Sequence, residues 1–193
     1  MPRTADKTRS IIVDAAARLF YGEGIRAVSM DAVAAKAGLT KKTLYYHFPS
    51  KDHLVTAYLE AQDQPTLALY RRWYSEAGGD AAQRVRGMFE GLSSVADHAK
   101  WRGCGFLRTT AELASTPGHP AVEAGRAHKK RFEAWLTETL ANEGLQDAPD
   151  IARKILVLLD GAATIMLIHR DADYIRSASE VAERLIKDAA ESS

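Results

Sequence analysis

Residues 29–51 read Ser-Met-Asp-Ala-Val-Ala-Ala-Lys-Ala-Gly-Leu-Thr-Lys-Lys-Thr-Leu-Tyr-Tyr-His-Phe-Pro-Ser-Lys, and they decide the fold of the amino-terminal part of the chain. They predict a short helix, a turn at residues 38–40 and a second short helix. Ser29 can cap the first of these helices, Gly38 suits the positive φ that ends it, and Thr40 can cap the second. Leu44 and Phe48 share the face of the second helix opposite its basic and aromatic residues. This pattern predicts a helix-turn-helix, which places its second helix in the DNA major groove.

The charge of the chain is distributed unevenly. The formal net charge of the 193 residues is only +1, but residues 1–50 contain eight basic and four acidic side chains, a net charge of +4. Residues 51–193 therefore carry a net charge of −3. A basic first segment on an acidic remainder indicates that one end of the chain binds a polyanion such as DNA.

The signals for cellular compartment favour the cytoplasm. The amino terminus is polar and lacks the apolar region of a signal peptide, and Cys104 is the single cysteine, so no intramolecular disulfide can form. The longest apolar stretch, residues 155–168, is interrupted by Asp160 and Gly161 and favours a buried helix over a membrane span. These features predict a soluble, cytoplasmic protein.

Apolar residues recur at intervals of three and four along nearly the whole chain, which predicts an all-α protein. Pro65 falls inside one long expected helix, where the missing amide donor predicts a kink or a break. The expected helices cover residues 8–22, 30–37, 41–48, 51–76, 80–99, 106–115, 120–143, 149–170 and 173–190.

Residues 44–51, Leu-Tyr-Tyr-His-Phe-Pro-Ser-Lys, closely resemble the end of the helix-turn-helix in the TetR family of bacterial transcriptional regulators. The order of the nine expected helices resembles that family over essentially the full length. The resemblance implies a three-helix DNA-binding head at residues 1–50 and a six-helix effector-binding and dimerisation domain at residues 51–193. It also implies a ligand-responsive regulator, commonly a repressor released from its operator by a small molecule, with no enzymatic activity and no cofactor.

The predicted DNA contacts lie in and around the second helix of the motif. Lys41 and Lys42 are at its amino-terminal end, where backbone amides also favour phosphate, and Thr43 is positioned to read a base. An ordinary solvated basic face is the competing interpretation, but it does not account for the turn and the aromatic pair. The resemblance implies that most of these contacts go to the DNA backbone. The predicted DNA-binding set is Ser29, Thr40, Lys41, Lys42, Thr43, Tyr45, Tyr46, His47 and Lys51.

The expected helix at residues 149–170 is apolar on most of its faces, so it must be buried in two directions. Its apolar residues repeat at spacings of four and three, which is typical of a seam between packed helices. Members of the resembled family dimerise through their last two helices, although a seam of this kind also suits a monomer core. The predicted dimerisation residues are Ile155, Leu158, Ala162, Ile165, Val181 and Leu185.

An effector pocket is expected in the middle of the chain, where aromatic and methionine residues recur at helical spacing. The same residues suit a plain hydrophobic core, and the resemblance does not imply which ligand would bind. The predicted ligand-binding residues are Met88, Phe89, Cys104, Phe106, His128, Phe132, Trp135 and Met166.

Cys104 supports an alternative function, as a thiol-dependent enzyme or a redox sensor. Gly103 and Gly105 flank it, and a cysteine exposed in this way can be reactive. No oxyanion hole or orienting third group is recognisable for an enzyme, and the six histidines show no metal-ligand spacing, so no metal site is expected. The expected partners are double-stranded operator DNA, a small-molecule effector and a second copy of the chain, with no membrane.

Overall fold

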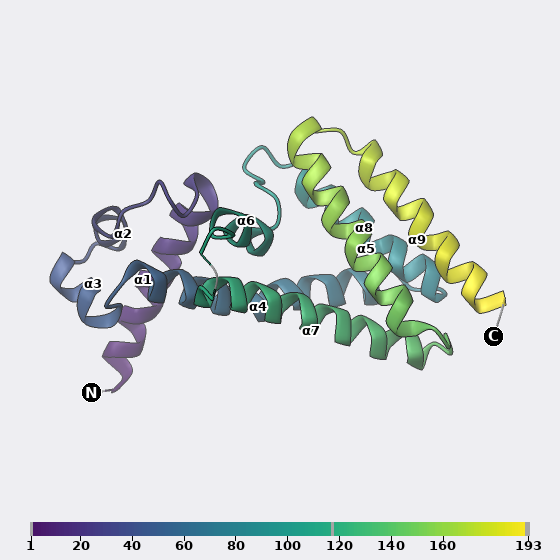
Figure 1. Cartoon of the computed structure of the whole chain (residues 1–193), viewed down its shortest axis with the longest axis horizontal. Coiled ribbons are helices and arrows are strands. Elements are labelled where there is room, and N and C mark those ends of the chain that lie inside the picture. Colours follow the sequence, from purple (N-terminus) through teal and green to yellow (C-terminus); the bar gives the residue numbers. More distant parts are fainter. Residues whose placement is uncertain (1, 117, 192–193) are drawn as a thin grey trace. The chain divides into compact units, whose positions relative to one another are not determined.

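The computed structural model describes residues 2–116 and 118–191, and this part of the chain is built from helices without any strand (Figure 1). The all-α prediction is confirmed. Most helix ends lie within a few residues of the expected ones, but the first helix begins earlier than expected. Within the described residues, no helix combines the length and apolar content needed to cross a membrane. The helices are α1 (Pro2–Glu23), α2 (Met30–Ala37), α3 (Lys41–His47), α4 (Lys51–Ala77), α5 (Ala81–Ala96), α6 (Gly105–Glu112), α7 (Pro120–Asn142), α8 (Ala148–His169) and α9 (Asp173–Glu191).

The helices pack into two compact units. Unit 1 comprises Met1–Gln64 and Gly105–Ala127, and unit 2 comprises Pro65–Cys104 and His128–Ser193. Helix α4 continues through Pro65 without a break, and the boundary between the units falls at this proline. These are packing units, so the functional boundary expected at residue 50 stays a prediction.

Unit 1 combines the helix-turn-helix with α6 and the start of α7. The Glu112 carboxylate of α6 accepts a hydrogen bond from the Arg26 amide (3.0 Å), and the Arg108 guanidinium donates one to the Tyr21 carbonyl (2.8 Å). Helix α6 begins at Gly105, where a Cβ atom would lie only 2.8 Å from the Tyr58 hydroxyl. These contacts explain why α6, which is distant in sequence, belongs to the same compact unit as the head.

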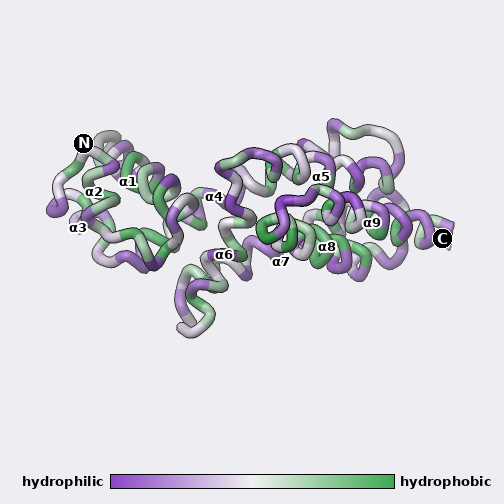
Figure 2. The backbone as a smooth tube through the Cα atoms, turned by 90° about the horizontal axis from the view of Figure 1, so that it is seen from above, coloured by the Kyte–Doolittle hydropathy of each residue, from purple (hydrophilic) through white to green (hydrophobic). Residues whose placement is uncertain are grey.

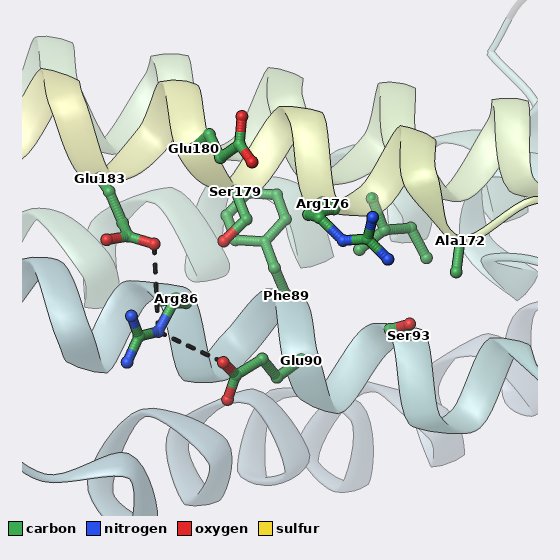
Figure 3. A pocket seen from close by; sticks show the side chains of 10 residues that line it. Arg86, Phe89, Glu90, Ser93, Ala172, Arg176, Ser179, Glu180 and Glu183 are labelled. Carbon is green, nitrogen blue, oxygen red and sulfur yellow. Dashed lines mark ion pairs between the residues drawn. The ribbon is translucent and has the colours of Figure 1, made fainter.

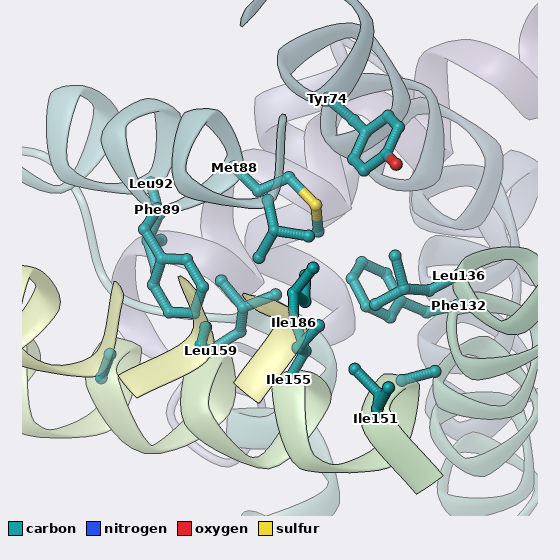
Figure 4. Close-up of a cluster of buried hydrophobic side chains, with 14 of the residues drawn as sticks. Tyr74, Met88, Phe89, Leu92, Phe132, Leu136, Ile151, Ile155, Leu159 and Ile186 are labelled. Atoms are coloured by element: carbon teal, nitrogen blue, oxygen red, sulfur yellow. The ribbon is translucent and has the colours of Figure 1, made fainter. Parts of the chain in front are cut away.

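The hydrophobic core of unit 2 lies between the second half of α4 and helices α5, α7, α8 and α9 (Figure 4). Met88, Leu136 and Ile155 are completely buried at its centre. An aromatic cluster continues the core, with the Phe132 ring 5.1 Å from Tyr70 and 5.5 Å from Trp135. Figure 2 shows α8 mainly in hydrophobic colours, while α9 alternates between hydrophobic and hydrophilic residues. Helix α8 thus supplies more apolar surface than one face of a core requires.

Candidate functional site

The turn between α2 and α3 is held by local hydrogen bonds. Gly38 ends α2 with φ 68°, and the Leu39 amide donates to the Ala34 carbonyl (3.0 Å). The Thr40 hydroxyl then accepts a hydrogen bond from the Thr43 amide (3.1 Å) and caps α3. The Ser29 hydroxyl caps α2 in the same way through the Ala32 amide (3.1 Å). The capping predictions for Gly38, Thr40 and Ser29 are confirmed, and the orientation of α3 relative to α2 is set by the backbone itself.

Two buried side chains attach α3 to the core of unit 1. Leu44 is completely buried and Phe48 is 1% exposed. The Arg9 guanidinium of α1 lies 4.9 Å from the centre of the Phe48 ring and covers it. These contacts confirm the predicted inner face of α3, so the opposite face is turned to solvent.

The outward face of α3 carries the basic and aromatic side chains. Tyr46 is 82% exposed, and Tyr45, Lys41 and Lys42 are also exposed. Lys41 forms an ion pair with Asp31 of α2 (2.9 Å), whose hydrogen bond and charge raise the pKa of Lys41. Lys42 has no acidic partner in the part of the chain that the structure describes. The sequence analysis did not include Asp31, although the spacing between α2 and α3 could have suggested this pair.

The remaining predicted DNA contacts are less exposed. Thr43 is half-buried, and its hydroxyl lies 2.9 Å from that of Thr40, so part of its hydrogen-bonding capacity is already used. The His47 ring packs edge-to-face on Tyr46 at 5.2 Å. Partial burial lowers the pKa of Lys51, although Glu112 and Asp52 act in the opposite direction. All three residues are half-buried, so they offer less surface to DNA than Tyr46 does.

Helix α8 leaves an apolar stripe in solvent on the side away from its own core. Val157 and Ile168 are 65% and 66% exposed, and Gly161 lies between them with nothing within 4 Å of a Cβ atom added there. On α9, Val181 is half exposed. Leu158, Ile165 and Leu185 are half-buried beside these residues. Exposed apolar residues on two successive helices form a surface suited to another protein subunit.

The structure corrects two of the predicted dimerisation residues. Ile155 is completely buried and Ala162 is 5% exposed, and both belong to the core of unit 2. These two positions of the four-three repeat in α8 lie on the side of the helix that packs inside the subunit. A second repeat, through Val157, Gly161 and Ile168, marks the outward side. The sequence predicted that α8 is apolar on most of its faces, but periodicity could not show which side the subunit buries.

Most of the predicted ligand-binding residues are packed inside unit 2. Met88, Phe89, Phe132 and Met166 are between 0% and 3% exposed in its core, and Trp135 packs against them. His128 is also buried in this unit. Phe106 is also buried, and it belongs to unit 1.

Cys104 lies in a polar cluster that the sequence analysis did not assemble. The Lys129 ammonium of α7 is 3.7 Å from the Cys104 sulfur and 2.5 Å from the Asp160 carboxylate of α8. Burial lowers the pKa of Lys129, but Cys104 and Asp160 outweigh this effect, so the pKa is raised overall. Desolvation, and then the proximity of Cys104 and Asp160, raises the pKa of Tyr70. The cluster therefore presents a protonated lysine and a neutral phenol next to the thiol.

The described residues contain no group of three or more histidine, cysteine, aspartate or glutamate side chains arranged to hold a metal ion. The functional candidates are therefore the exposed face of α3, the outward stripe of α8 and α9, and the interior of unit 2 with its polar cluster.

Known proteins share both the helix-turn-helix and the whole fold. Residues 12–58 match the sequence model described as "Bacterial regulatory proteins, tetR family". The crystal structure of a TetR-family transcriptional regulator from Streptomyces coelicolor is similar over 95% of this chain and 96% of that chain, with 31% sequence identity and a TM-score of 0.82.

Two characterised relatives differ in how much of their length is similar. The HTH-type transcriptional regulator SrpR of Pseudomonas putida is 36% identical over 76 residues, so the match spans only 36% of its length. The HTH-type transcriptional repressor KstR2 of Mycobacterium tuberculosis is 25% identical over 146 residues, which cover 74% of this chain and 70% of that protein. The names of both relatives describe transcriptional regulators.

Proposed function

This chain belongs to the TetR family of DNA-binding bacterial transcriptional regulators, and we propose that it is a homodimeric repressor that a small-molecule effector releases from a palindromic operator. The observation that carries the proposal is the outward face of α3, with exposed Lys42 and Tyr46 on a turn held by Gly38 and Thr40. Lysine and tyrosine side chains of this kind bind phosphate oxygens and position a helix in the major groove. Such a regulator acts in the cytoplasm, where bacterial DNA lies.

A dimer is needed because a single helix-turn-helix reads only one half-site. Two-fold dimers place their two recognition helices in successive major grooves, about 34 Å apart. The outward stripe of Val157, Gly161, Ile168 and Val181 supports a partner surface on α8 and α9. Half-buried Leu158, Ile165 and Leu185 would complete its edges. Ile155 and Ala162 are left out of this proposed interface because their own subunit buries them.

We place the effector inside unit 2, among Met88, Phe132, Trp135 and the cluster around Cys104. The aromatic and methionine side chains would contact the apolar part of a ligand, and Lys129 would contact a polar part. Helix α4 belongs to both units, so a ligand that repacks Tyr70 on its second half can alter the position of its first half, next to the helix-turn-helix. Release from DNA would follow when the two heads no longer fit successive grooves.

Repression, and not activation, is proposed on two grounds. The name of KstR2 describes it as a repressor, and its similarity covers 74% of this chain. Repression is also the commoner mode in the family that the helix-turn-helix resembles.

A second candidate role is thiol sensing at Cys104, which its contact with the Lys129 ammonium favours. A neighbouring cation stabilises the thiolate form in which cysteine reacts. If the thiol is the sensor, a thiol-alkylating reagent should release the wild-type protein from DNA and leave the Cys104→Ser variant bound. Equal release of both proteins would remove this role.

The proposed function is tested by titrating a fluorescent duplex from the region upstream of the chain's own gene. The wild-type protein should bind this duplex at least about 1,000-fold more tightly than a scrambled duplex of equal length at the same salt concentration. Tyr46→Ala should weaken binding to both duplexes, because this exposed tyrosine is assigned to phosphate. Equal affinity for the two duplexes would contradict a specific regulator of this gene and require other upstream regions to be tried.

A further inference from the structure

A groove lies between α5 and α9 of unit 2 (Figure 3), and its lining does not include Cys104, Lys129 or Asp160 of the polar cluster. It encloses about 360 Å³, which lies within the usual range for small-molecule sites. The apolar side chains of Phe89 on α5 and Ile175 on α9 line the groove, and Ala172 and Ser93 lie toward one end (Figure 3). The groove is therefore large enough for a compact ligand with an apolar body.

Ser179 supplies the polar feature of the groove. The residue is only 6% exposed and lines the groove from α9, and its hydroxyl oxygen has no hydrogen-bond partner in the described structure. A buried hydroxyl without a partner is unfavourable, and nearly all such groups in folded proteins are satisfied. A ligand group that forms a hydrogen bond with the Ser179 hydroxyl would supply the missing partner.

Most of the charged side chains around the groove form ion pairs, and Glu180, which forms none in the described structure, is exposed to solvent. Arg86 of α5 lies 3.2 Å from Glu90 and 4.0 Å from Glu183, so it bridges the two helices at one end (Figure 3). Arg176 is paired with Asp173 at 2.8 Å. A charged ligand group placed against Arg86 or Arg176 would have to displace one of these pairs, whereas a neutral hydrogen-bonding group needs only the hydroxyl of Ser179.

We propose that this groove binds an uncharged small molecule with an apolar body and one hydroxyl or carbonyl group. The apolar body lies on Phe89 and Ile175, and the polar group forms a hydrogen bond with Ser179. Because the ligand contacts both helices, it holds α9 against α5 and stabilises unit 2. The site is separate from the proposed effector cluster at Lys129, and its occupation does not depend on DNA binding.

Three probes with the same aromatic body test whether the groove prefers a neutral, an anionic or a cationic ligand: 2-naphthalenemethanol, 2-naphthoate and 2-naphthylmethylammonium. In calorimetric titrations of the full chain without DNA, the neutral alcohol should bind about tenfold more tightly than either charged probe. Tighter binding of the carboxylate or the ammonium probe would overturn the proposed ligand class. No binding of the alcohol at about 1 mM would overturn the site.

Ser179→Ala tests whether the alcohol binds at the Ser179 hydroxyl. The matched control is Ser177→Ala, at an exposed position of the same helix. Ser179→Ala should weaken binding of the alcohol by about three- to tenfold, while its unliganded melting temperature stays equal to or above that of the wild type, because no protein hydrogen bond is lost. Ser177→Ala should bind like the wild type. Unchanged binding by Ser179→Ala, or a lower melting temperature of the variant, would overturn the assignment of this hydroxyl.

Ser93→Leu fills the groove from α5 and tests the remaining occupant, a second copy of the chain. It should abolish binding of the alcohol and leave the sedimenting mass and DNA affinity of the protein unchanged. A smaller sedimenting mass would show that the groove is a contact between copies and would overturn the ligand proposal.

Discussion

The outward face of α3 and the outward stripe of α8 are both exposed, but they are built in opposite ways. On α3, charged and aromatic side chains stand on a short helix whose direction is set by caps at Thr40 and Gly38. On α8, aliphatic side chains stand on a long helix whose direction is set only by the core of unit 2. The first surface therefore depends on local sequence, and the second depends on which side of the helix the subunit buries.

The glycines in these two regions show the same difference. Gly38 has φ 68°, a conformation that side chains rarely adopt, so its role is in the backbone. Gly161 lies inside a regular helix with open space around it, so its role is in the surface that it leaves free. A residue added at Gly38 strains the chain, whereas a residue added at Gly161 changes only what can approach from outside.

The largest expected effect is dissociation of the dimer by a charge on the outward stripe of α8, which the same charge on the inner side of α8 would not produce without unfolding the subunit. Gly161→Glu should leave the subunit folded but place an unpaired carboxylate in the proposed dimer interface, a cost of several kcal/mol. The dimer dissociation constant should rise at least about 100-fold, and operator binding should be lost with it. Analytical ultracentrifugation and circular dichroism measure assembly and folding separately.

The matched control is Ala99→Glu, which adds the same charge at an exposed position of unit 2 outside α8 and α9. It should remain dimeric and bind DNA. Ala162→Glu should unfold unit 2 because Ala162 lies in its core. A Gly161→Glu protein that sediments as the wild-type dimer would place the interface on another surface.

On α3, the neighbouring residues Lys41 and Lys42 should contribute differently to DNA affinity. Lys42 has no acidic partner in the described structure, so Lys42→Ala should weaken DNA binding by about five- to tenfold and lower the salt slope by about one. Lys41 is held by Asp31 and must share its charge, so Lys41→Ala should have the smaller effect. Fluorescence anisotropy over a range of salt concentrations measures both. A larger effect at Lys41 would mean that Asp31 releases it completely in the complex.

Asp31 itself should limit the affinity of unit 1 for DNA. Asp31→Asn removes a negative charge beside the phosphate-binding face and frees Lys41, so affinity should rise by about two- to fivefold for operator and scrambled duplexes alike. The melting temperature should change little, since the Lys41–Asp31 pair is exposed. Weaker binding by Asp31→Asn would instead show that the pair positions Lys41 for DNA.

The smallest effect concerns the backbone of the turn. Gly38→Ala forces a side chain into the left-handed region and should destabilise unit 1 by about 1 kcal/mol, without a steric clash. Gly22→Ala is the matched control, because Gly22 lies in α1 with open space around it and should gain stability from helix propensity. Thermal melts of the two variants should therefore shift in opposite directions. A shift in the same direction would show that the turn does not require glycine.

These differences explain which parts of the molecule could be predicted from the sequence. The caps at Ser29 and Thr40 and the anchors Leu44 and Phe48 depend on residues within a few positions of each other, and all were predicted correctly. The pair Lys129–Asp160 joins positions 31 residues apart, so only the packing of α7 on α8 reveals it. The inner and outer stripes of α8 are both apolar, which is why Ile155 and Ala162 were assigned to the wrong side.

The location of α6 could not be predicted for a similar reason. Its apolar residues, including Phe106, indicate only that one face is buried. The contacts of Glu112 with Arg26 and of Arg108 with Tyr21 decide that α6 packs in unit 1. Residues distant in sequence make these contacts, and no local pattern records them.

The central claim, a two-fold dimer that reads DNA through α3, is tested most directly by selecting duplexes from a random library with the purified wild-type protein and sequencing them. If two copies of α3 read DNA in this way, the selected duplexes should share a palindromic consensus whose two half-sites are centred about one helical turn, or a small multiple of it, apart. The Gly161→Glu variant should enrich no such palindrome. A wild-type consensus without two-fold symmetry, or no enrichment at all, would contradict the account.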